Sequence, residues 1–127
     1  MWALGTMKIQ ATRQEYIPAW VNPEVLEKLW IFNPNYYIKS WSGSPKIGWF
    51  AYDIPDVRTG FCTGDMYLEE IDGHLTVGFV AGRHRTRWLM TRGDPLIPVG
   101  LEEHHYQKAL SIGLAVSRVL AHEELNA

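Results

Sequence analysis

One stretch of the sequence, residues 75–101, constrains the fold more than any other. It reads LTVGFVAGRHRTRWLMTRGDPLIPVGL. Apolar residues alternate with other residues from Leu75 to Ala81, which is the period of a β-strand. Gly82 permits a tight turn, a basic amphipathic segment follows, and Gly93 precedes a second apolar run. The stretch therefore predicts a strand, a turn, a basic helix and a second strand lying beside the first.

Local signals predict a helix and a hairpin on the N-terminal side of this stretch. Asn22 followed by Pro23 is a helix-start signal, because Asn caps a helix and Pro fits its first turn. The helix should end near Asn33, since a proline follows that residue. The dipeptide Asp72-Gly73 is favoured in two-residue hairpin turns and predicts that residues 66–71 and 74–80 pair as strands.

Weaker patterns complete an expected α+β domain over residues 1–127, with a small mixed sheet, a strand-GRHR-helix-strand core and a C-terminal helix. Residues 8–16 are expected as an opening strand, 36–38 as a short strand, 51–65 mostly as a loop with a short helix near Pro55, and 102–124 as the final helix. Residues 1–7 are a candidate for a disordered start, and Met7 is an alternative start codon.

Composition narrows the function classes. The 127 residues are enough for one hydrophobic core, and the net charge of -2 provides no global attraction to nucleic acid. Four arginines nevertheless lie within residues 83–92, so any contact with a polyanion would be local. Cys62 is the single cysteine, which favours a reducing compartment. Without an apolar leader or a run of about 20 apolar residues, the expected location is the cytoplasm.

The start of the basic helix is the candidate functional site. Arg83, His84 and Arg85 would surround the unpaired N–H groups of the first turn, where a phosphate or a carboxylate is favoured. Arg87 lies one turn after Arg83, so the two repel unless an anion or an acidic side chain lies between them. The predicted anion- or partner-binding residues are Gly82, Arg83, His84, Arg85 and Arg87. The alternative is a solvated basic face.

A second candidate surface is aromatic. Trp41, Trp49 and Phe50 lie beside Gly-rich loops, and aromatic side chains are favoured as interface anchors. They are therefore candidate interface residues, with burial in the core as the alternative.

The sequence favours no metal site and no resident cofactor. His104 and His105 are adjacent, so on a helix they point in different directions, and a surface or capping role is expected. Asp53, Asp56 and Asp65 are expected to be solvated loop carboxylates, with a divalent ion as the alternative.

Several motifs in one order resemble a known superfamily. The pieces are Tyr36-Tyr37, Ile47-Gly48, Gly82-Arg83-His84-Arg85, Trp88-Leu89 and Ile97-Pro98-Val99. Between two strands, this arrangement resembles the ParB/sulfiredoxin-like fold, and within it the plasmid fertility inhibition factors. The resemblance spans about residues 35–101. It implies a cytoplasmic protein that blocks conjugative transfer of a co-resident plasmid by binding the transfer machinery, with the type IV coupling ATPase as the expected partner and no membrane insertion.

The sequence departs from the enzymatic relatives at one position. Sulfiredoxin-like enzymes carry a reactive cysteine directly after the glycine, and ParB-like nucleotide hydrolases carry a glutamate, whereas this chain has Arg83. The resemblance therefore leaves enzymatic activity uncertain and leans against it. The alternative is a nucleotide-binding enzyme that uses ATP or CTP as NTPase, phosphotransferase or nuclease. DNA binding is disfavoured by the acidic net charge, and the oligomeric state stays open.

Overall fold

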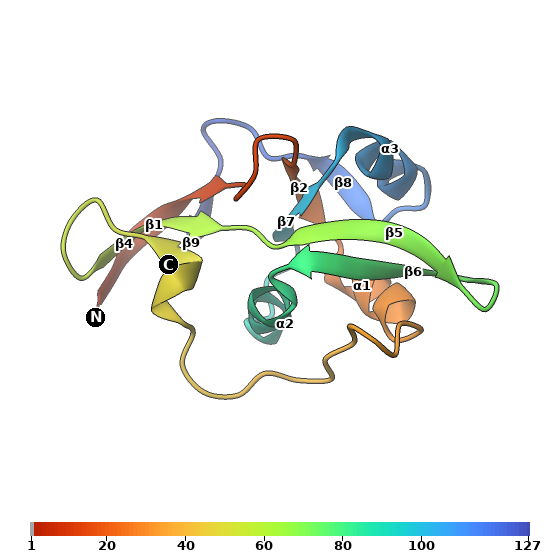
Figure 1. The fold of residues 1–127 in the computed structure, drawn as a ribbon. Coiled ribbons are helices and arrows are strands. Elements are labelled where there is room, and N and C mark those ends of the chain that lie inside the picture. The colour runs from red at the N-terminus through yellow and green to blue at the C-terminus, as the bar shows by residue number, and fades with distance from the viewer. Residues whose placement is uncertain (1) are drawn as a thin grey trace.

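Nine strands and three α-helices are present in a computed structural model that describes residues 2–127, with side chains described from Gly5 onward (Figure 1). Met1, one of the two candidate starts, lies outside the described residues. The strands are β1 (Trp2–Gln10), β2 (Ile17–Val21), β3 (Phe50–Ala51), β4 (Val57–Cys62), β5 (Asp65–Ile71), β6 (His74–Ala81), β7 (Ile97–Leu101), β8 (Ala115–Arg118) and β9 (Glu124–Asn126). The helices are α1 (Pro23–Trp30), α2 (Arg83–Thr91) and α3 (Glu103–Ser111), and a 3-10 turn covers Ile47–Trp49.

The strands form two mixed sheets, which confirms the α+β class. The larger sheet has the order β6-β5-β7-β2-β8, and the smaller has the order β3-β4-β1-β9. In the larger sheet β5 and β7 are parallel and the other neighbours are antiparallel. In the smaller sheet β1 and β4 are parallel. Helices α1 and α2 lie on one side of the larger sheet and α3 on the other (Figure 1).

The hairpin and the first two helices form as the local signals predict. Asp72 and Gly73 have positive φ values of 51° and 81°, as the two central residues of a primed hairpin turn require. The Asn22 side chain accepts hydrogen bonds from the N–H groups of Glu24 and Val25, which starts α1. The basic helix α2 follows its N-cap Gly82 and ends before the turn at Gly93, which has a positive φ.

The core lies between the larger sheet and α1, and it continues under the smaller sheet. Trp30 of α1 is fully buried, and its ring centroid lies 5.0 Å from that of Phe79 on β6. Met7 on β1 and Phe61 on β4 are also fully buried. Both sheets therefore contribute to one continuous apolar interior.

Three predictions about strands are wrong. The strand β7 lies between β5 and β2, not beside β6. Residues 36–38 are irregular because side chains occupy their carbonyl groups: Tyr36 O accepts from Trp30 Nε1 and Ile38 O from Arg87 Nε. Residues 51–65, expected as loop, contain β4, whose pairing partner β1 is distant in sequence.

The two ends of the chain also differ from expectation. The first strand begins at residue 2 and ends at Gln10, so the candidate disordered start falls on β1. The final helix ends at Ser111, because Gly113 adopts a φ of 77° and Leu114 N donates to Ala109 O. The remaining residues form β8 and β9, although their apolar spacing continues the helical period. Within the described residues, no helix has the length and apolar character needed to cross a bilayer.

Two glycines that flank α2 provide a matched test of the fold. Gly82 and Gly93 have φ values of 87° and 80°, but a Cβ at Gly82 would lie 2.4 Å from Gly64 Cα, whereas a Cβ at Gly93 would meet no atom within 4 Å. We expect Gly93→Ala to lower the free energy of unfolding by about 1–2 kcal/mol through backbone strain alone. Gly82→Ala should cost clearly more, because two backbone segments must separate. Urea unfolding measures both values, and equal losses would contradict the close approach of residues 64 and 82.

Candidate functional site

The first turn of α2 is open to an anion. Gly82 is the N-cap in the left-handed conformation, and it offers no side chain to the amides that follow. Gly82 O accepts hydrogen bonds from Thr86 N at 3.0 Å and from Thr86 Oγ1 at 2.8 Å. The first turn contains no acidic residue. The partial positive charge of the helix end is therefore not neutralised from within α2.

Arg83 is half-exposed and bound on one side only. Its Nη1 donates to Asn35 O at 3.1 Å, and its guanidinium lies 5.8 Å from the centre of the Tyr36 ring. The other N–H groups of the guanidinium remain available, because an Arg side chain carries five donors. Arg83 can therefore contact an anion while it holds the irregular segment after α1.

The side chain of Arg85 is partly buried between the start of α2 and the end of β4. Its Nη1 donates to Cys62 O at 3.1 Å, and its buried Nε has no hydrogen-bond partner among the described residues. Burial lowers the pKa of Arg85, and the nearby groups of Cys62 and Asp65 oppose that shift. Because an Arg side chain stays protonated near neutral pH, this places a partly desolvated positive charge next to the open amides.

His84 lies on the outer surface of the same turn. Its ring contacts Trp41 edge-on at a centroid distance of 5.6 Å. The pKa of His84 lies below its ordinary value, first because of desolvation and then because of the positive charges of Arg83 and Lys46. The imidazole is therefore mainly neutral at pH 7, and it gains charge when a nearby anion offsets those cations.

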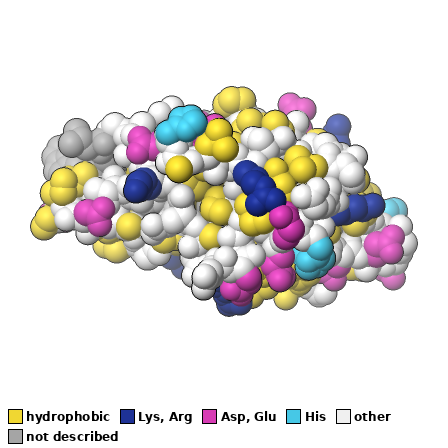
Figure 2. All heavy atoms as spheres, turned by 90° about the horizontal axis from the view of Figure 1, so that it is seen from above, with side chains coloured by type: hydrophobic (Ala, Val, Ile, Leu, Met, Phe, Trp, Pro, Cys, Tyr) yellow, Lys and Arg dark blue, Asp and Glu magenta, His cyan; other side chains and the backbone are white. Residues whose placement is uncertain are grey.

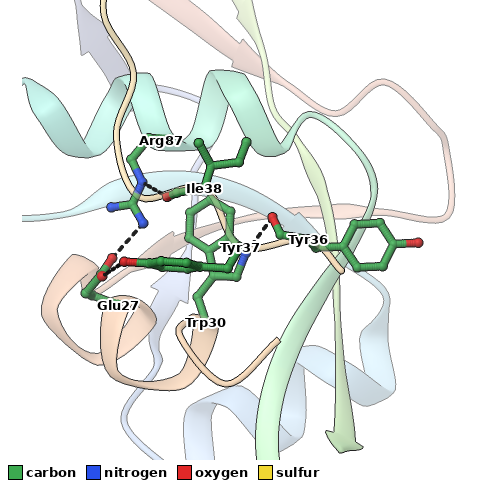
Figure 3. Close-up of polar contacts among 6 residues, drawn as sticks. All are labelled: Glu27, Trp30, Tyr36, Tyr37, Ile38 and Arg87. Atoms are coloured by element: carbon green, nitrogen blue, oxygen red, sulfur yellow. Dashed lines mark hydrogen bonds and ion pairs between the residues drawn. The ribbon is translucent and has the colours of Figure 1, made fainter. Parts of the chain in front are cut away.

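Arg87 does not belong to this site, which corrects the sequence-based grouping (Figure 3). Its side chain is 7% exposed; Nε donates to Ile38 O at 2.6 Å, and Nη2 lies 2.7 Å from Glu27 Oε1. The Tyr37 hydroxyl donates to the other oxygen of Glu27. The guanidinium also lies 4.7 Å from the Trp30 ring centre. The acidic group expected near Arg87 is thus supplied by the protein itself.

The proposed aromatic interface is mostly internal. Trp49 and Phe50 are only 6% and 7% exposed, so they belong to the core. Trp41 is half-buried, and its ring centroid lies 5.3 Å from that of Trp49, which in turn lies 5.9 Å from that of Trp88 on α2. This aromatic group supports α2 and His84 from the side, so the residues act as structural support rather than as an exposed surface.

Sequence reasoning missed a buried acidic residue near the site. Asp65 begins β5 and is fully buried, not a solvated loop carboxylate. Its Oδ2 accepts from Thr12 Oγ1 at 2.7 Å and lies 3.6 Å from Arg13 Nε, while Oδ1 has no described hydrogen-bond partner. Thr63 Oγ1 nearby is also buried and without a described partner. No local pattern indicates this burial, because it depends on β5 pairing with β7.

The histidines and carboxylates of the described residues were compared with the requirements of a metal site. No group of three or more His, Cys, Asp or Glu side chains in the described part of the chain is arranged to hold a metal ion. His105 instead accepts a hydrogen bond from Leu68 N of β5 through Nδ1 at 3.3 Å, so it joins α3 to the sheet and does not cap a helix.

Comparison of the chain with protein-family models, with curated proteins and with solved structures gives no match. The site is therefore interpreted from its own geometry: an open helix start with Arg83, His84 and Arg85 around it, and Arg87 committed to the interior.

Replacing Arg83 and replacing Arg87, which lie one turn apart on α2, should have different effects on the free energy of unfolding. Arg87→Ala leaves Glu27 and two aromatic rings without their cation, so we expect a loss of about 3 kcal/mol in the free energy of unfolding. Arg83→Ala removes one hydrogen bond at the surface and should cost about 0.5 kcal/mol. Urea unfolding of both variants, with Glu27→Gln for a double-mutant cycle, measures the difference. Equal losses, or no coupling between positions 27 and 87, would contradict the structural role of Arg87.

Proposed function

We propose that this chain is a binding protein whose α2 start docks on acidic groups of a partner protein. The observation that carries the proposal is the uncapped first turn of α2, with Arg83, His84 and Arg85 around it and no acidic residue in it. Such a terminus favours carboxylates or phosphates, and electrostatic complementarity of this kind selects partners and accelerates their association.

The resemblance to plasmid fertility inhibition factors suggests the class of partner. On that basis the protein acts in the cytoplasm, binds a component of a conjugative transfer system, and blocks transfer of a co-resident plasmid. The proposed partner is the type IV coupling ATPase. Arg83 occupies the position of the reactive cysteine or glutamate of the enzymatic relatives, so steric occupation of the partner is favoured over turnover.

A nucleotide-binding enzyme is the second candidate, and one observation favours it. Arg85 Nε and Asp65 Oδ1 are both buried without described hydrogen-bond partners, close to the helix start. Phosphoryl transfer depends mainly on positioned charges of this kind. This candidate requires saturable ATP or CTP binding and product formation with a divalent ion, whereas the binding-protein proposal requires neither.

Conjugation provides the direct test. Donor cells that express the wild-type protein should yield clearly fewer transconjugants than donor cells without it. Arg83→Ala combined with Arg85→Ala should restore transfer. The matched control is Arg118→Ala, which removes an exposed cation that pairs with Glu103 far from α2 in the sequence. Unchanged transfer of several plasmid groups by the wild-type protein, at confirmed expression, would remove the proposal.

The pH dependence of anion binding tests the site itself. Carboxylates that bind beside His84 offset Arg83 and Lys46, so they should raise the lowered pKa of His84 and cause proton uptake on binding. The affinity for a Glu-rich probe peptide should therefore increase between about pH 8 and about pH 6. Calorimetry at several pH values measures this increase, and His84→Asn should flatten it. An affinity that falls as the pH is lowered would contradict the assignment of His84 to the site.

A further inference from the structure

A second interaction surface follows from the way β5 is paired. Strand β6 accompanies β5 from Asp65 to Ile71, but β7 pairs with it only through Asp65 and Met66. After Leu101 the chain leaves the sheet and enters α3. From residue 67 to the hairpin turn, β5 therefore has a strand on one side only.

The backbone groups on this side can be assigned from the register. In an antiparallel pair, alternate residues direct both N–H and C=O toward the same neighbour. Leu68 pairs with Val77, but its N–H points away from β6 and donates to His105 Nδ1 on α3. By the same alternation, Leu68 C=O and both backbone groups of Glu70 face away from β6. These three groups have no strand opposite them.

A groove lies along this edge. It has a volume of about 670 Å³ and is lined by Leu68 and Glu70 of β5 and by His104, His105 and Lys108 of α3. His105 occupies the first hydrogen-bonding position that a neighbouring strand would take. Proteins normally cover or charge such edges because they invite strand addition. Here the edge is covered at Leu68 and open at Glu70.

Charge decides which strand fits. Glu70 is exposed on the edge, and the charge of Glu102 at the start of α3 opposes the lowering of the pKa of His105. The carboxylate of Glu69 instead accepts a hydrogen bond from Asn33 Nδ2 at 3.2 Å, on the α1 side of the sheet. Lys108 is the lysine that lines the groove. Figure 2 shows the face seen from above the view of Figure 1, on which histidine, acidic and basic side chains are interspersed. A second copy of this chain paired antiparallel along the edge would bring glutamates opposite glutamates, which is destabilising.

We propose that the free edge of β5, residues 68–71, adds an extended, basic segment of a partner protein as a further strand, seated in the groove between β5 and α3. The partner strand forms its hydrogen bonds with Leu68 C=O and with the N–H and C=O of Glu70, and its lysine or arginine side chains lie opposite Glu70. Strand addition at an open edge is an established mode of peptide recognition. The surface is distinct from the α2 start and does not depend on the function proposed for it.

The probe is a fluorescent peptide of about eight residues in which Lys and Val alternate, with a backbone length sufficient to cover the edge. It is compared with the same peptide carrying N-methyl groups on alternate valines, which removes donors without changing charge, and with a Glu/Val peptide. Fluorescence anisotropy gives the dissociation constants, and hydrogen exchange gives the protection of the Glu70 amide. We expect saturable binding of the Lys/Val peptide, at least about tenfold weaker binding of the other two, and slower exchange of the Glu70 amide.

Substitutions at position 70 separate strand addition from simple charge attraction. Glu70→Pro removes an N–H that β6 does not use, a replacement that edge strands tolerate, and should abolish binding. Glu70→Gln keeps the N–H and should weaken binding only a few-fold. Equal losses in the two variants, equal binding of the N-methylated peptide, or no binding by the wild-type protein would overturn the proposal.

If Glu70→Pro fails to fold, the affinity of the wild-type protein for the N-methylated peptide still tests whether backbone hydrogen bonds are required. The variant with both Arg83 and Arg85 replaced should bind the peptide as the wild-type protein does. The proposal for the β5 edge can therefore fail independently of the proposal for the α2 start.

Discussion

The contact between Arg87 and Glu27 is the interaction on which the arrangement around α2 depends. It joins three segments: α1 provides Glu27, α2 provides Arg87, and the irregular chain between residues 31 and 46 provides Ile38 O and Tyr37. Burying a guanidinium is unfavourable unless its donors and its charge are matched. Here a carboxylate, a carbonyl oxygen and two aromatic faces supply that match. Arg83, through Asn35 O, and His84, through the Trp41 ring, add weaker contacts between this segment and α2.

Because Arg87 has this internal role, the basic segment does not form one continuous cationic surface. Four arginines in ten residues suggest a single cationic surface, but each of the first three donates to a different backbone carbonyl group: Asn35 O, Cys62 O and Ile38 O. A guanidinium with five donors can hold a backbone carbonyl and still present N–H groups to solvent, as long as it is not enclosed. Exposure therefore separates Arg83, and partly Arg85, from Arg87. The site at the α2 start therefore contains fewer residues than the sequence predicts, because Arg87 is excluded from it.

The two proposed surfaces use different physical principles. At the α2 start, oriented amides and cationic side chains attract an acidic group of the partner, whatever the conformation of the segment that carries it. At the β5 edge, the requirement is a backbone in extended conformation, and charge only selects among such strands. The first surface therefore determines the sign of a partner's charge, and the second determines its conformation. A protein that carries both can contact one large partner at an acidic patch and at a basic extended segment.

Prediction from the sequence succeeded where a few neighbouring residues decide the structure. The hairpin at Asp72-Gly73, the cap at Asn22 and the β6-α2-β7 unit each depend on residues close to one another in the chain. It failed where the deciding partner is distant. Strand β4 has no clear period of its own and forms because β1 lies beside it, and β8 forms although its apolar spacing suits a helix.

The amino-acid sequence by itself thus determined the turns, the helix starts and the basic character of α2, because positive φ values, capping side chains and hydrophobic period are local properties. Only the tertiary structure decided which arginine is buried, that Asp65 lies inside, and which edge of β5 remains open. Those outcomes depend on neighbours brought from 20 or more residues away, Ile38 beside Arg87 and Gly100 beside Asp65 among them. Burial and pairing are properties of the assembled fold, so residue type alone cannot assign them.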